Sequence, residues 1–348
     1  MATKKHSTES DAGDGLIVVT GAGGFIGGAL VRHFAGKGFK RIRAVDKKPL
    51  RDWYQRTPGV DCLCMDLSEK ENCIRACEGA WEVYNLAADM GGMGFIERFR
   101  VECLRSVLIN THMTEAAWRA GADRYFYASS ACAYNVELQK DPKAIALKES
   151  DAYPAMAERG YGWEKLFSEM VCQEYWAERG MRTQIARFHN VYGPWGTWDG
   201  GREKAPAAIC RKVIEAKASG NLSIEIWGNG DQTRSFMFID DCVDGIDRIM
   251  HSDALTAVPI NLGSSELFSI NALVSLAEEI GGVRLERRYD LNAPQGVAGR
   301  NSDNTYIKKM LGWEPSTPFK VGLTKTYHWI EQQFKDRRAG KQTVRDVA

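Results

Sequence analysis

The sequence predicts an α/β protein that is built on a doubly wound parallel sheet and carries a smaller, interleaved C-terminal α/β lobe. A short apolar run at residues 16–19 leads into a glycine-rich turn and then a helical segment. Short apolar runs alternate with helical patterns as far as residue 188, which is typical of parallel strands joined by helices. From residue 189 the chain becomes rich in glycine, tryptophan and proline, so a second lobe is expected to begin there.

The elements of the first sheet can be placed along the chain in order. Strands are expected at residues 16–19, 41–45, 60–65, 81–85, 125–128 and 184–188. Helical patterns such as ENCIRACEG and LINTHMTEAAWRAG separate most of these strands. The segment SFMFIDDCVDGIDRIM is expected to return the chain to this sheet after an excursion into the second lobe.

These elements divide the chain into two interleaved domains and two tails. The first domain is expected over residues 15–188, with a return segment at about 233–262, and the second lobe over 189–232 and 263–335. Residues 1–14 are expected to form a disordered tail and residues 336–348 a short C-terminal tail. Because ligands of such sheets bind at the carboxyl ends of the strands, the site is expected between the two lobes.

Composition excludes several classes of protein. The 348 residues are 44% apolar and 26% charged, and the formal net charge of +1 gives no reason to expect a nucleic-acid or membrane partner. No apolar run reaches the roughly 18 residues of a membrane helix, and the polar start MATKKHSTESDAGDG lacks the apolar segment of a secretory signal. Nine cysteines without a CxxC pair and six scattered histidines predict free thiols, no metal site and a cytoplasmic, reducing location.

The motif TGAGGFIG predicts a dinucleotide site and makes the sheet one of the Rossmann type. Its glycines, Gly21, Gly24 and Gly27, are spaced as G-x-x-G-x-x-G between an apolar strand and a helix. The first permits a tight turn, the second lets backbone approach a pyrophosphate, and the third lets the helix pack on the strand. A structural glycine turn is the alternative, but the strand before and the helix after favour cofactor binding.

The identity of the cofactor depends on Asp46, which closes the second expected strand 19 residues after Gly27. A carboxylate at this point bonds ribose hydroxyls and repels a 2′-phosphate, which favours NAD. Lys47 and Lys48 follow directly and could tolerate that phosphate, so NADP stays open. Further contacts with the cofactor are expected at Phe25, Ile26, Asp66, Leu67 and Ala87.

The segment YGWEK places Tyr161 and Lys165 four residues apart on one face of a helix. A tyrosine with an ordinary pKa of about 10 is a poor base at neutral pH. A nearby ammonium group and the positive nicotinamide would stabilise its phenolate, which could then take a hydroxyl proton. An exposed Tyr/Lys pair is the alternative, and the preceding glycine motif and the SS at a strand end argue against it.

Together TGAGGFIG, FYASSACAY and YGWEK resemble the extended short-chain dehydrogenase/reductase superfamily. The resemblance implies that Ser130 completes a catalytic triad with Tyr161 and Lys165. It also implies that Asn110 supports the lysine, partly through water. Tyr161 and Lys165 contact the cofactor in this superfamily as well.

A narrower resemblance rests on NLAADMGGMGFI, YASSAC, RFHNVYGPWGTW, GGREKAPAA, WGNGDQTRSF and GRNSDN. From about residue 16 to residue 329, the chain is similar to the family of GDP-mannose 3,5-epimerases. That family is NAD-dependent and inverts C3 and C5 of the sugar through a 4-keto intermediate, giving GDP-L-galactose, with GDP-L-gulose left open as a second product. The resemblance assigns Cys132 as the base and Lys204 as the acid on the opposite face. A lone cysteine is otherwise more often a buried apolar residue.

The resemblance also implies a set of contacts with the sugar nucleotide. Asn135 departs from the proline or glycine of relatives, which leaves the exact sugar open. His189 is expected to be a packed histidine. The substrate contacts expected are Gly91, Gly92, Met93, Ser130, Ala131, Cys132, Asn190, Lys204, Trp227, Gln232, Arg234 and Arg300.

Four other functions are weighed against this one from the sequence. A 3,5-epimerase for another nucleotide hexose or heptose would use the same groups. A nucleotide-sugar 4-epimerase would use most of them. A 4,6-dehydratase is disfavoured because Cys132 stands where that class has an acidic residue. A silent NAD-binding sensor would need none of the five candidate catalytic residues. Relatives also imply a homodimer formed through helices that include the Tyr161 helix.

Overall fold

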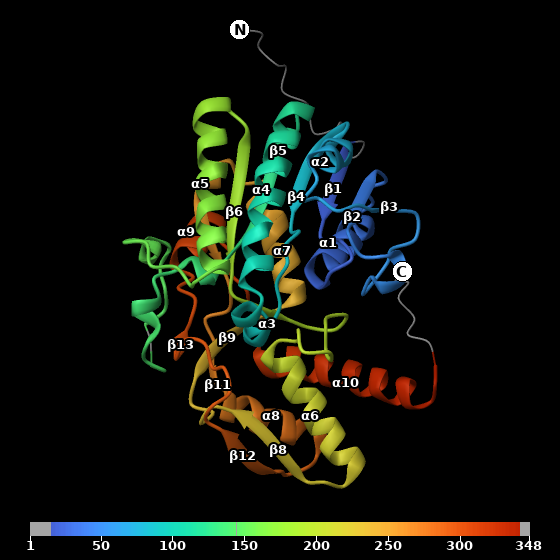
Figure 1. Cartoon of the computed structure of the whole chain (residues 1–348), viewed down its shortest axis with the longest axis vertical. Coiled ribbons are helices and arrows are strands. Elements are labelled where there is room, and N and C mark those ends of the chain that lie inside the picture. The colour runs from blue at the N-terminus through green and yellow to red at the C-terminus, as the bar shows by residue number, and fades with distance from the viewer. Residues whose placement is uncertain (1–14, 144, 342–348) are drawn as a thin grey trace.

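A seven-stranded parallel sheet organises the first part of the chain (Figure 1). The computed structural model describes residues 15–143 and 145–341. The sheet order is β10-β6-β5-β4-β1-β2-β3, and every neighbouring pair is parallel. Its strands are β1 (Leu16–Thr20), β2 (Ile42–Asp46), β3 (Asp61–Cys64), β4 (Ala80–Asn85), β5 (Arg124–Ser130), β6 (Arg182–Phe188) and β10 (Pro259–Leu262). The predicted fold class is confirmed, and each of the six expected strands is present.

Helices cover both faces of this sheet, so its central strands are buried on each side. All five residues of β1 are buried, as a near-continuous apolar strand requires in a doubly covered parallel sheet. One face carries α1 (Phe25–Gly36) and α7 (Ile239–Met250). The opposite face carries α2 (Lys70–Cys77), α4 (Arg100–Ala120) and α5 (Tyr161–Arg179).

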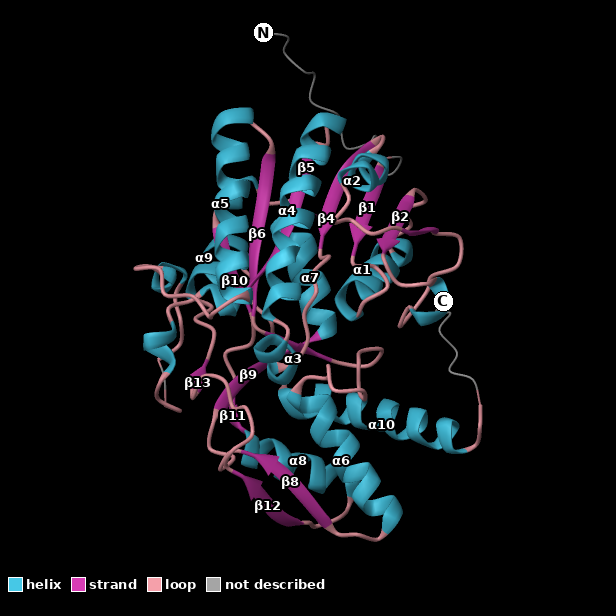
Figure 2. Ribbon diagram, viewed as in Figure 1, coloured by secondary structure: helices cyan, strands magenta, loops and turns pink. Residues whose placement is uncertain are grey.

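A second lobe lies at the carboxyl ends of the central strands (Figure 2). Its strands form a four-stranded group, β7 (Asn190–Tyr192), β9 (Thr233–Phe238), β11 (Leu267–Ser269) and β13 (Gly299–Arg300), and a pair, β8 (Ser223–Trp227) and β12 (Glu286–Asp290). Helices α6 (Ala205–Ser219), α8 (Ile270–Gly281) and α10 (Phe319–Arg338) pack together in this lobe. Two further helices are α3 (Met93–Arg98), which leads into α4, and α9 (Thr305–Leu311), which packs beside β10.

Two segments lie differently from the boundaries expected from the sequence. The return to the first sheet was expected from about residue 233, but β9 pairs with β7, β11 and β13 instead. The return is therefore made by α7 and β10, because β9 has its ladder partners in the second lobe. Helix α10 continues to Arg338, past residue 336 where a tail was expected. The predicted tail at 1–14 lies outside the described residues, as do residues 342–348.

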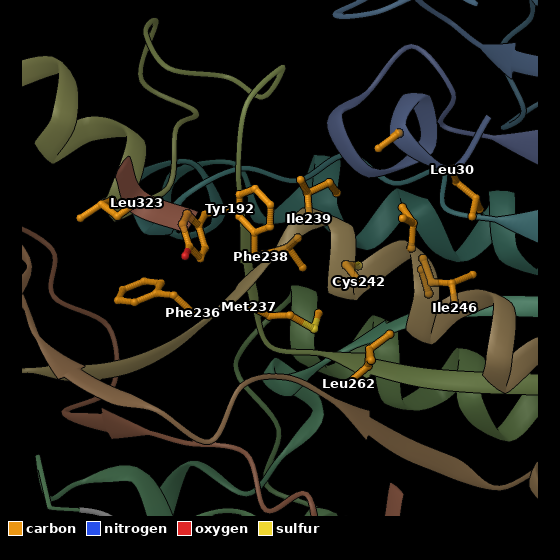
Figure 3. Close-up of a cluster of buried hydrophobic side chains, with 14 of the residues drawn as sticks. Leu30, Tyr192, Phe236, Met237, Phe238, Ile239, Cys242, Ile246, Leu262 and Leu323 are labelled. Atoms are coloured by element: carbon orange, nitrogen blue, oxygen red, sulfur yellow. The ribbon is translucent and has the colours of Figure 1, made fainter. Parts of the chain in front are cut away.

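The two sheets share one hydrophobic core (Figure 3). Phe236, Met237 and Phe238 of β9 run directly into Ile239 and Cys242 of α7, and all five side chains are buried. This core extends from α1 in the first domain to α10 in the second lobe, so the site between the lobes is built on packed elements. No helix among the described residues is long and apolar enough to cross a membrane.

Candidate active site

A cavity of about 310 Å³ lies where β1, β2, β4, β5 and β6 end. The segments that follow these strands form its floor, and residues 193–204 close one side. Such a position, at the carboxyl ends of parallel strands, is where doubly wound sheets bind nucleotides. All eleven expected cofactor contacts line it: Gly21, Gly24, Phe25, Ile26, Gly27, Asp46, Asp66, Leu67, Ala87, Tyr161 and Lys165.

The glycine turn between β1 and α1 has the geometry that a pyrophosphate needs. Gly21 has φ +68°, which glycine adopts readily. A Cβ at Gly27 would lie 2.3 Å from the carbonyl oxygen of Gly21, so only glycine fits where α1 meets the turn. No side chain caps the N-terminus of α1 at Gly24, and its N–H groups are left to face an anion. The residues present therefore fit a dinucleotide.

Asp46 is held rigidly at the end of β2. Its Oδ2 accepts a hydrogen bond from the Gly23 backbone at 3.0 Å, and Oδ1 accepts one from the Lys48 backbone at 3.0 Å. Each carboxylate oxygen keeps a lone pair for a ribose hydroxyl. Lys47 pairs with Asp89 at 2.5 Å, and Lys48 Nζ donates to the Gly23 carbonyl at 3.3 Å. Because both lysines have partners within the protein, the site favours NAD over NADP.

Ser130, Tyr161 and Lys165 all line this cavity. The spacing of YGWEK predicted the Tyr161/Lys165 pair, and the family resemblance implied Ser130. Lys165 Nζ lies 5.4 Å from the centre of the Tyr161 ring and donates to the Ala128 carbonyl at 3.0 Å. Burial raises the pKa of Tyr161 well above 10, while the hydrogen bond with Ser130 opposes that rise. The tyrosine is therefore a phenol in the protein alone, and additional positive charge is needed beside it to stabilise the phenolate.

A buried carboxylate beneath Lys165 was not anticipated from the sequence. Glu164 Oε2 lies 3.8 Å from Lys165 Nζ, and Glu164 Oε1 accepts hydrogen bonds from Asn110 and Ser168. Asn110 was expected to support Lys165, and its side-chain amide instead donates to Glu164 beside the lysine. Its own carbonyl oxygen accepts from Asn85 at 2.9 Å, which ties the network to the end of β4.

Cys132 lies in a single 3-10 turn, η3 (Ala131–Ala133), directly after β5. Ser130 Oγ accepts a hydrogen bond from the Cys132 backbone at 3.2 Å. The thiol is only 6% exposed, and Arg300 Nη1 approaches its sulfur at 3.5 Å. A Cβ at Gly162 would lie 2.2 Å from the Cys132 carbonyl oxygen, so α5 packs directly against this turn. The thiol therefore occupies a fixed position beside Tyr161.

Glu158 completes this cluster, and it was not predicted from the sequence. Its carboxylate forms an ion pair with Arg300 Nη2, and its backbone N–H donates to the Cys132 carbonyl at 3.0 Å. Arg300 also donates to Gln139 Oε1 at 2.6 Å through Nε. The guanidinium that was expected to grip a diphosphate is thus directed at the thiol and its neighbours. An acidic residue three positions before Tyr161 was the only hint available.

The electrostatics of the cluster make the Lys204 ammonium more acidic than usual, and they make the Cys132 thiolate, once formed, more basic than usual. Burial and then the Glu158 carboxylate raise the pKa of Cys132, while Arg300 and Lys204 oppose that rise. Desolvation lowers the pKa of Lys204, while Cys132 opposes that fall. An amine with a lowered pKa gives up a proton more readily, as a general acid must.

The remaining expected substrate contacts lie around the cluster in the second lobe. Arg234 on β9 donates to backbone carbonyls, including Thr233 at 2.7 Å and Gln295 at 3.2 Å, and burial lowers its pKa to about 10. Gln232 donates to the Trp227 carbonyl at 2.7 Å. Asn190 bonds the Ser235 carbonyl at 3.2 Å and does not line the cavity.

Two glycine-rich loops meet above the cavity. Gly92 N–H donates to the Arg202 carbonyl at 3.1 Å, and a Cβ at Gly92 would lie 2.7 Å from the Glu203 carbonyl. Gly91 and Lys204 both line the cavity there. Met93 packs near Gly296, and Gly94 faces the half-exposed ring of Trp227, so both lobes contribute to this loop contact.

His189 is a packed histidine, as expected. It is buried, and its Nε2 lies 3.0 Å from Asn261 Oδ1. Burial lowers its pKa to about 4, so the ring is neutral at physiological pH.

Comparison with known proteins identifies relatives of high similarity. Residues 17–263 match the NAD dependent epimerase/dehydratase family. The chain is 44% identical over 330 residues to GDP-mannose 3,5-epimerase of Arabidopsis thaliana, covering 93% of this chain and 84% of that protein. It is 43% identical over 329 residues to GDP-mannose 3,5-epimerase 1 of Oryza sativa subsp. japonica, covering 92% and 83%.

Solved structures share the fold over nearly the whole chain. UDP-glucose 4-epimerase of Thermotoga maritima, solved with UDP-glucose, superimposes with a TM-score of 0.80 at 21% identity and covers 91% of this chain and 99% of that one. MoeE5, solved in complex with UDP-glucose and NAD, gives a TM-score of 0.76 at 28% identity and covers 92% and 100%. The cavity at the strand ends thus belongs to a fold in which a relative holds both NAD and a nucleotide sugar.

Proposed function

The chain belongs to the NAD dependent epimerase/dehydratase family, and we propose that it is an isomerase that inverts C3 and C5 of GDP-mannose to give GDP-L-galactose. NAD, when bound, accepts the hydride of the sugar's C4 and later returns it. The two relatives with 43–44% identity carry the name GDP-mannose 3,5-epimerase. A thiol and an ammonium beside a Ser/Tyr/Lys group provide the two-sided acid–base chemistry that this activity needs.

The first step assigned to the protein's own residues is proton removal from the C4 hydroxyl. Tyr161 takes this proton through its phenolic oxygen, since Lys165 lies near its ring and Ser130 is its hydrogen-bond partner. The resulting C4 ketone makes the hydrogens on C3 and C5 acidic, because the carbanion left behind is delocalised as an enolate.

The second step is inversion at each of the two carbons. Cys132 removes the ring proton and Lys204 donates a proton to the opposite face. Two residues on different faces are required, because return of the proton to the same face would restore the original configuration. The observation that carries this proposal is the position of the buried Cys132 thiol, in the turn that packs directly against the Tyr161 helix.

Product analysis tests the proposed reaction. Purified protein is incubated with GDP-mannose, the nucleotide sugar is hydrolysed, and the released hexoses are separated. We expect galactose, with or without gulose. If GDP-mannose is recovered unchanged while another nucleotide hexose or heptose is epimerised, the sugar assignment is wrong and the acid–base assignment stands. A product altered only at C4 contradicts both.

We also propose a homodimer that is formed through α4 and α5. Large apolar side chains are exposed along both helices at spacings of three and four residues, which places them on one face of each helix. These side chains are Val101, Leu104, Leu108, Trp163, Phe167 and Met170, each between 41% and 66% exposed. A face of this kind on two adjacent helices suits a second copy of the chain. A cytoplasmic location is proposed from the nine unpaired cysteines.

Charge placed on this face tests the dimer. Phe167→Glu is expected to give a monomer in light scattering, because a carboxylate would be buried in the apolar contact. Leu222→Glu is the matched control, since Leu222 is 50% exposed in the second lobe. A wild-type monomer, or a Phe167→Glu protein that remains dimeric, contradicts the proposal.

A further inference from the structure

The Glu158 carboxylate touches the reactive cluster, yet the proposed reaction gives it no task. Its side chain is 11% exposed and pairs with Arg300, which is itself 7% exposed. Arg300 simultaneously reaches the sulfur of Cys132 at 3.5 Å. One guanidinium therefore bridges a carboxylate and a thiol. Its positive charge stabilises the thiolate of Cys132 less when it is also paired with the Glu158 carboxylate.

The backbone fixes Glu158 in this position. Its N–H donates to the Cys132 carbonyl at 3.0 Å, and its carbonyl accepts from Trp163 at 3.3 Å in the first turn of α5. The segment thus runs alongside η3, and it cannot move without disturbing Cys132. The position of the carboxylate is therefore as well defined as that of the thiol.

Most of the charges that face Cys132 are positive. Arg300 contacts the sulfur directly, and Lys204 acts on the thiol at longer range. Arg234 lies within electrostatic reach of both Arg300 and Cys132. Glu158 is the anion that opposes these three cations among the groups that face the thiol. The titratable groups around Cys132 are Cys103, Glu158, Tyr161, Lys204, Arg234 and Arg300.

A thiol that faced three cations without a counter-ion would ionise readily, because nearby positive charge stabilises a thiolate. Glu158 instead uses the guanidinium of Arg300 as its own partner. The pKa directions agree with this geometry. Burial and Glu158 together raise the pKa of Cys132, whereas Arg300 holds the pKa of Glu158 below its ordinary value despite burial. The resting cluster thus holds a thiol and a carboxylate.

We propose that Glu158 is a positioning residue that sets the basicity of Cys132 by occupying Arg300, so that the sulfur stays protonated at rest and is a strong base once ionised. The catalytic role of this basicity rests on the proposed function, in which the sulfur of Cys132 removes a proton from a ring carbon. A more basic thiolate removes such a proton faster. No group is oxidised or reduced, and the proton of the thiol is the only one displaced when the sulfur ionises.

The proposal is tested by removing the negative charge of Glu158 while keeping the size of its side chain. The ionisation of Cys132 is followed by the ultraviolet absorbance of the thiolate across a pH titration, as the difference between each protein and the same protein carrying Cys132→Ser. Glu158→Gln is expected to lower the midpoint by about one pH unit or more, because Arg300 becomes free to stabilise the thiolate. An unchanged or raised midpoint overturns the proposal.

Two further variants separate charge from packing. Glu158→Asp keeps the negative charge, so its midpoint is expected to stay near that of the wild-type protein; a fall as large as that of Glu158→Gln overturns the proposal. Gln139→Glu adds a carboxylate at the Nε side of Arg300, where Gln139 now accepts at 2.6 Å. Its midpoint is expected to rise, and a fall or no change again overturns the proposal.

The titration needs no sugar substrate, so it is independent of the proposed reaction. A protein that fails to epimerise GDP-mannose can still show the shift, and an active epimerase can lack it. The accompanying kinetic expectation applies above the midpoints of both proteins, where Cys132 is fully ionised. There kcat of Glu158→Gln is expected to fall by roughly threefold for each pH unit of lowered midpoint, if the Brønsted slope is about 0.5. KM is expected to stay constant, whereas misfolding would change both and release NAD.

Discussion

The cofactor side and the sugar side of the site are built in different ways. On the cofactor side, the contacts lie mainly at the ends of β1, β2, β3 and β4, and backbone geometry at Gly21 and Gly27 decides the fit. On the sugar side, the decisive groups are side chains from distant segments. Cys132 and Arg300 are 168 residues apart in sequence, and Glu158 and Arg300 are 142 apart.

This difference in construction predicts that the cofactor side and the sugar side respond differently to mutation. Backbone turns and helix ends bind an anion without titrating, so binding of the cofactor's pyrophosphate should survive changes of charge on the sugar side. The sugar side consists of ionisable groups that shift one another, so its chemistry should respond to each charge. Binding of NAD and epimerisation are therefore expected to be separable by mutation.

The largest difference between the loss of epimerisation and the loss of bound NAD is expected for Cys132→Ala. Removal of a general base typically costs about 10²–10⁴ in rate, and we expect a loss of epimerisation in this range with NAD retained, because Cys132 does not line the cofactor cavity. Cys172→Ala is the matched control, since Cys172 is also buried but lies on the core-facing side of α5. Turnover and bound NAD are measured on both proteins. Equal losses of turnover in the two variants, or loss of NAD from Cys132→Ala, would show that epimerisation and NAD binding are not separable in this way.

A second test uses the same substitution on each side. Gly27→Ala places a Cβ 2.3 Å from the Gly21 carbonyl, and Gly162→Ala places one 2.2 Å from the Cys132 carbonyl. Each clash is with backbone and should cost about 1–3 kcal/mol. We expect Gly27→Ala to be purified without NAD, and Gly162→Ala to retain more NAD while losing turnover. Absorbance of the released nucleotide and an activity assay measure the two effects, and the reverse pattern contradicts the comparison.

The sequence predicted the two sides unequally for a physical reason. The glycine spacing, Asp46 and the Tyr161/Lys165 pair are local patterns, and the structure gathers all of them at the cavity. Cys132 and Lys204 were assigned through family resemblance, since nothing local marks a thiol as reactive. Glu158 was missed because its importance lies in a contact with Arg300 across 142 residues. Strand β9 was placed in the wrong sheet because an apolar run does not reveal its ladder partner.

The smallest effect is expected in the framework away from both sides. His251 pairs with Asp247 through Nδ1 at 3.0 Å and with the buried Glu82 through Nε2 at 3.1 Å. Despite burial, these partners raise its pKa to about 10. The ordinary value in the unfolded chain is about 6.5. The stability it contributes is therefore complete below about 6.5 and is lost as the pH rises through about 10.

His251→Gln measures this contribution. The side chain is 41% exposed, so solvent screening should reduce the effect to about 1 kcal/mol. We expect thermal unfolding at neutral pH to shift down by a few degrees, and the difference from the wild-type protein to shrink toward pH 10. Bound NAD and turnover should not change at a temperature where both proteins are folded. A difference that grows with pH would contradict the sign of this linkage.

Hydrogen exchange at the two ring carbons tests the central claim most directly. The protein is incubated with GDP-mannose in deuterated water, and the positions of deuterium in the nucleotide sugar are determined by NMR. The account predicts deuterium at both C3 and C5, and none with Cys132→Ala. Exchange at neither carbon in the wild-type protein, or exchange that persists without the thiol, would contradict it.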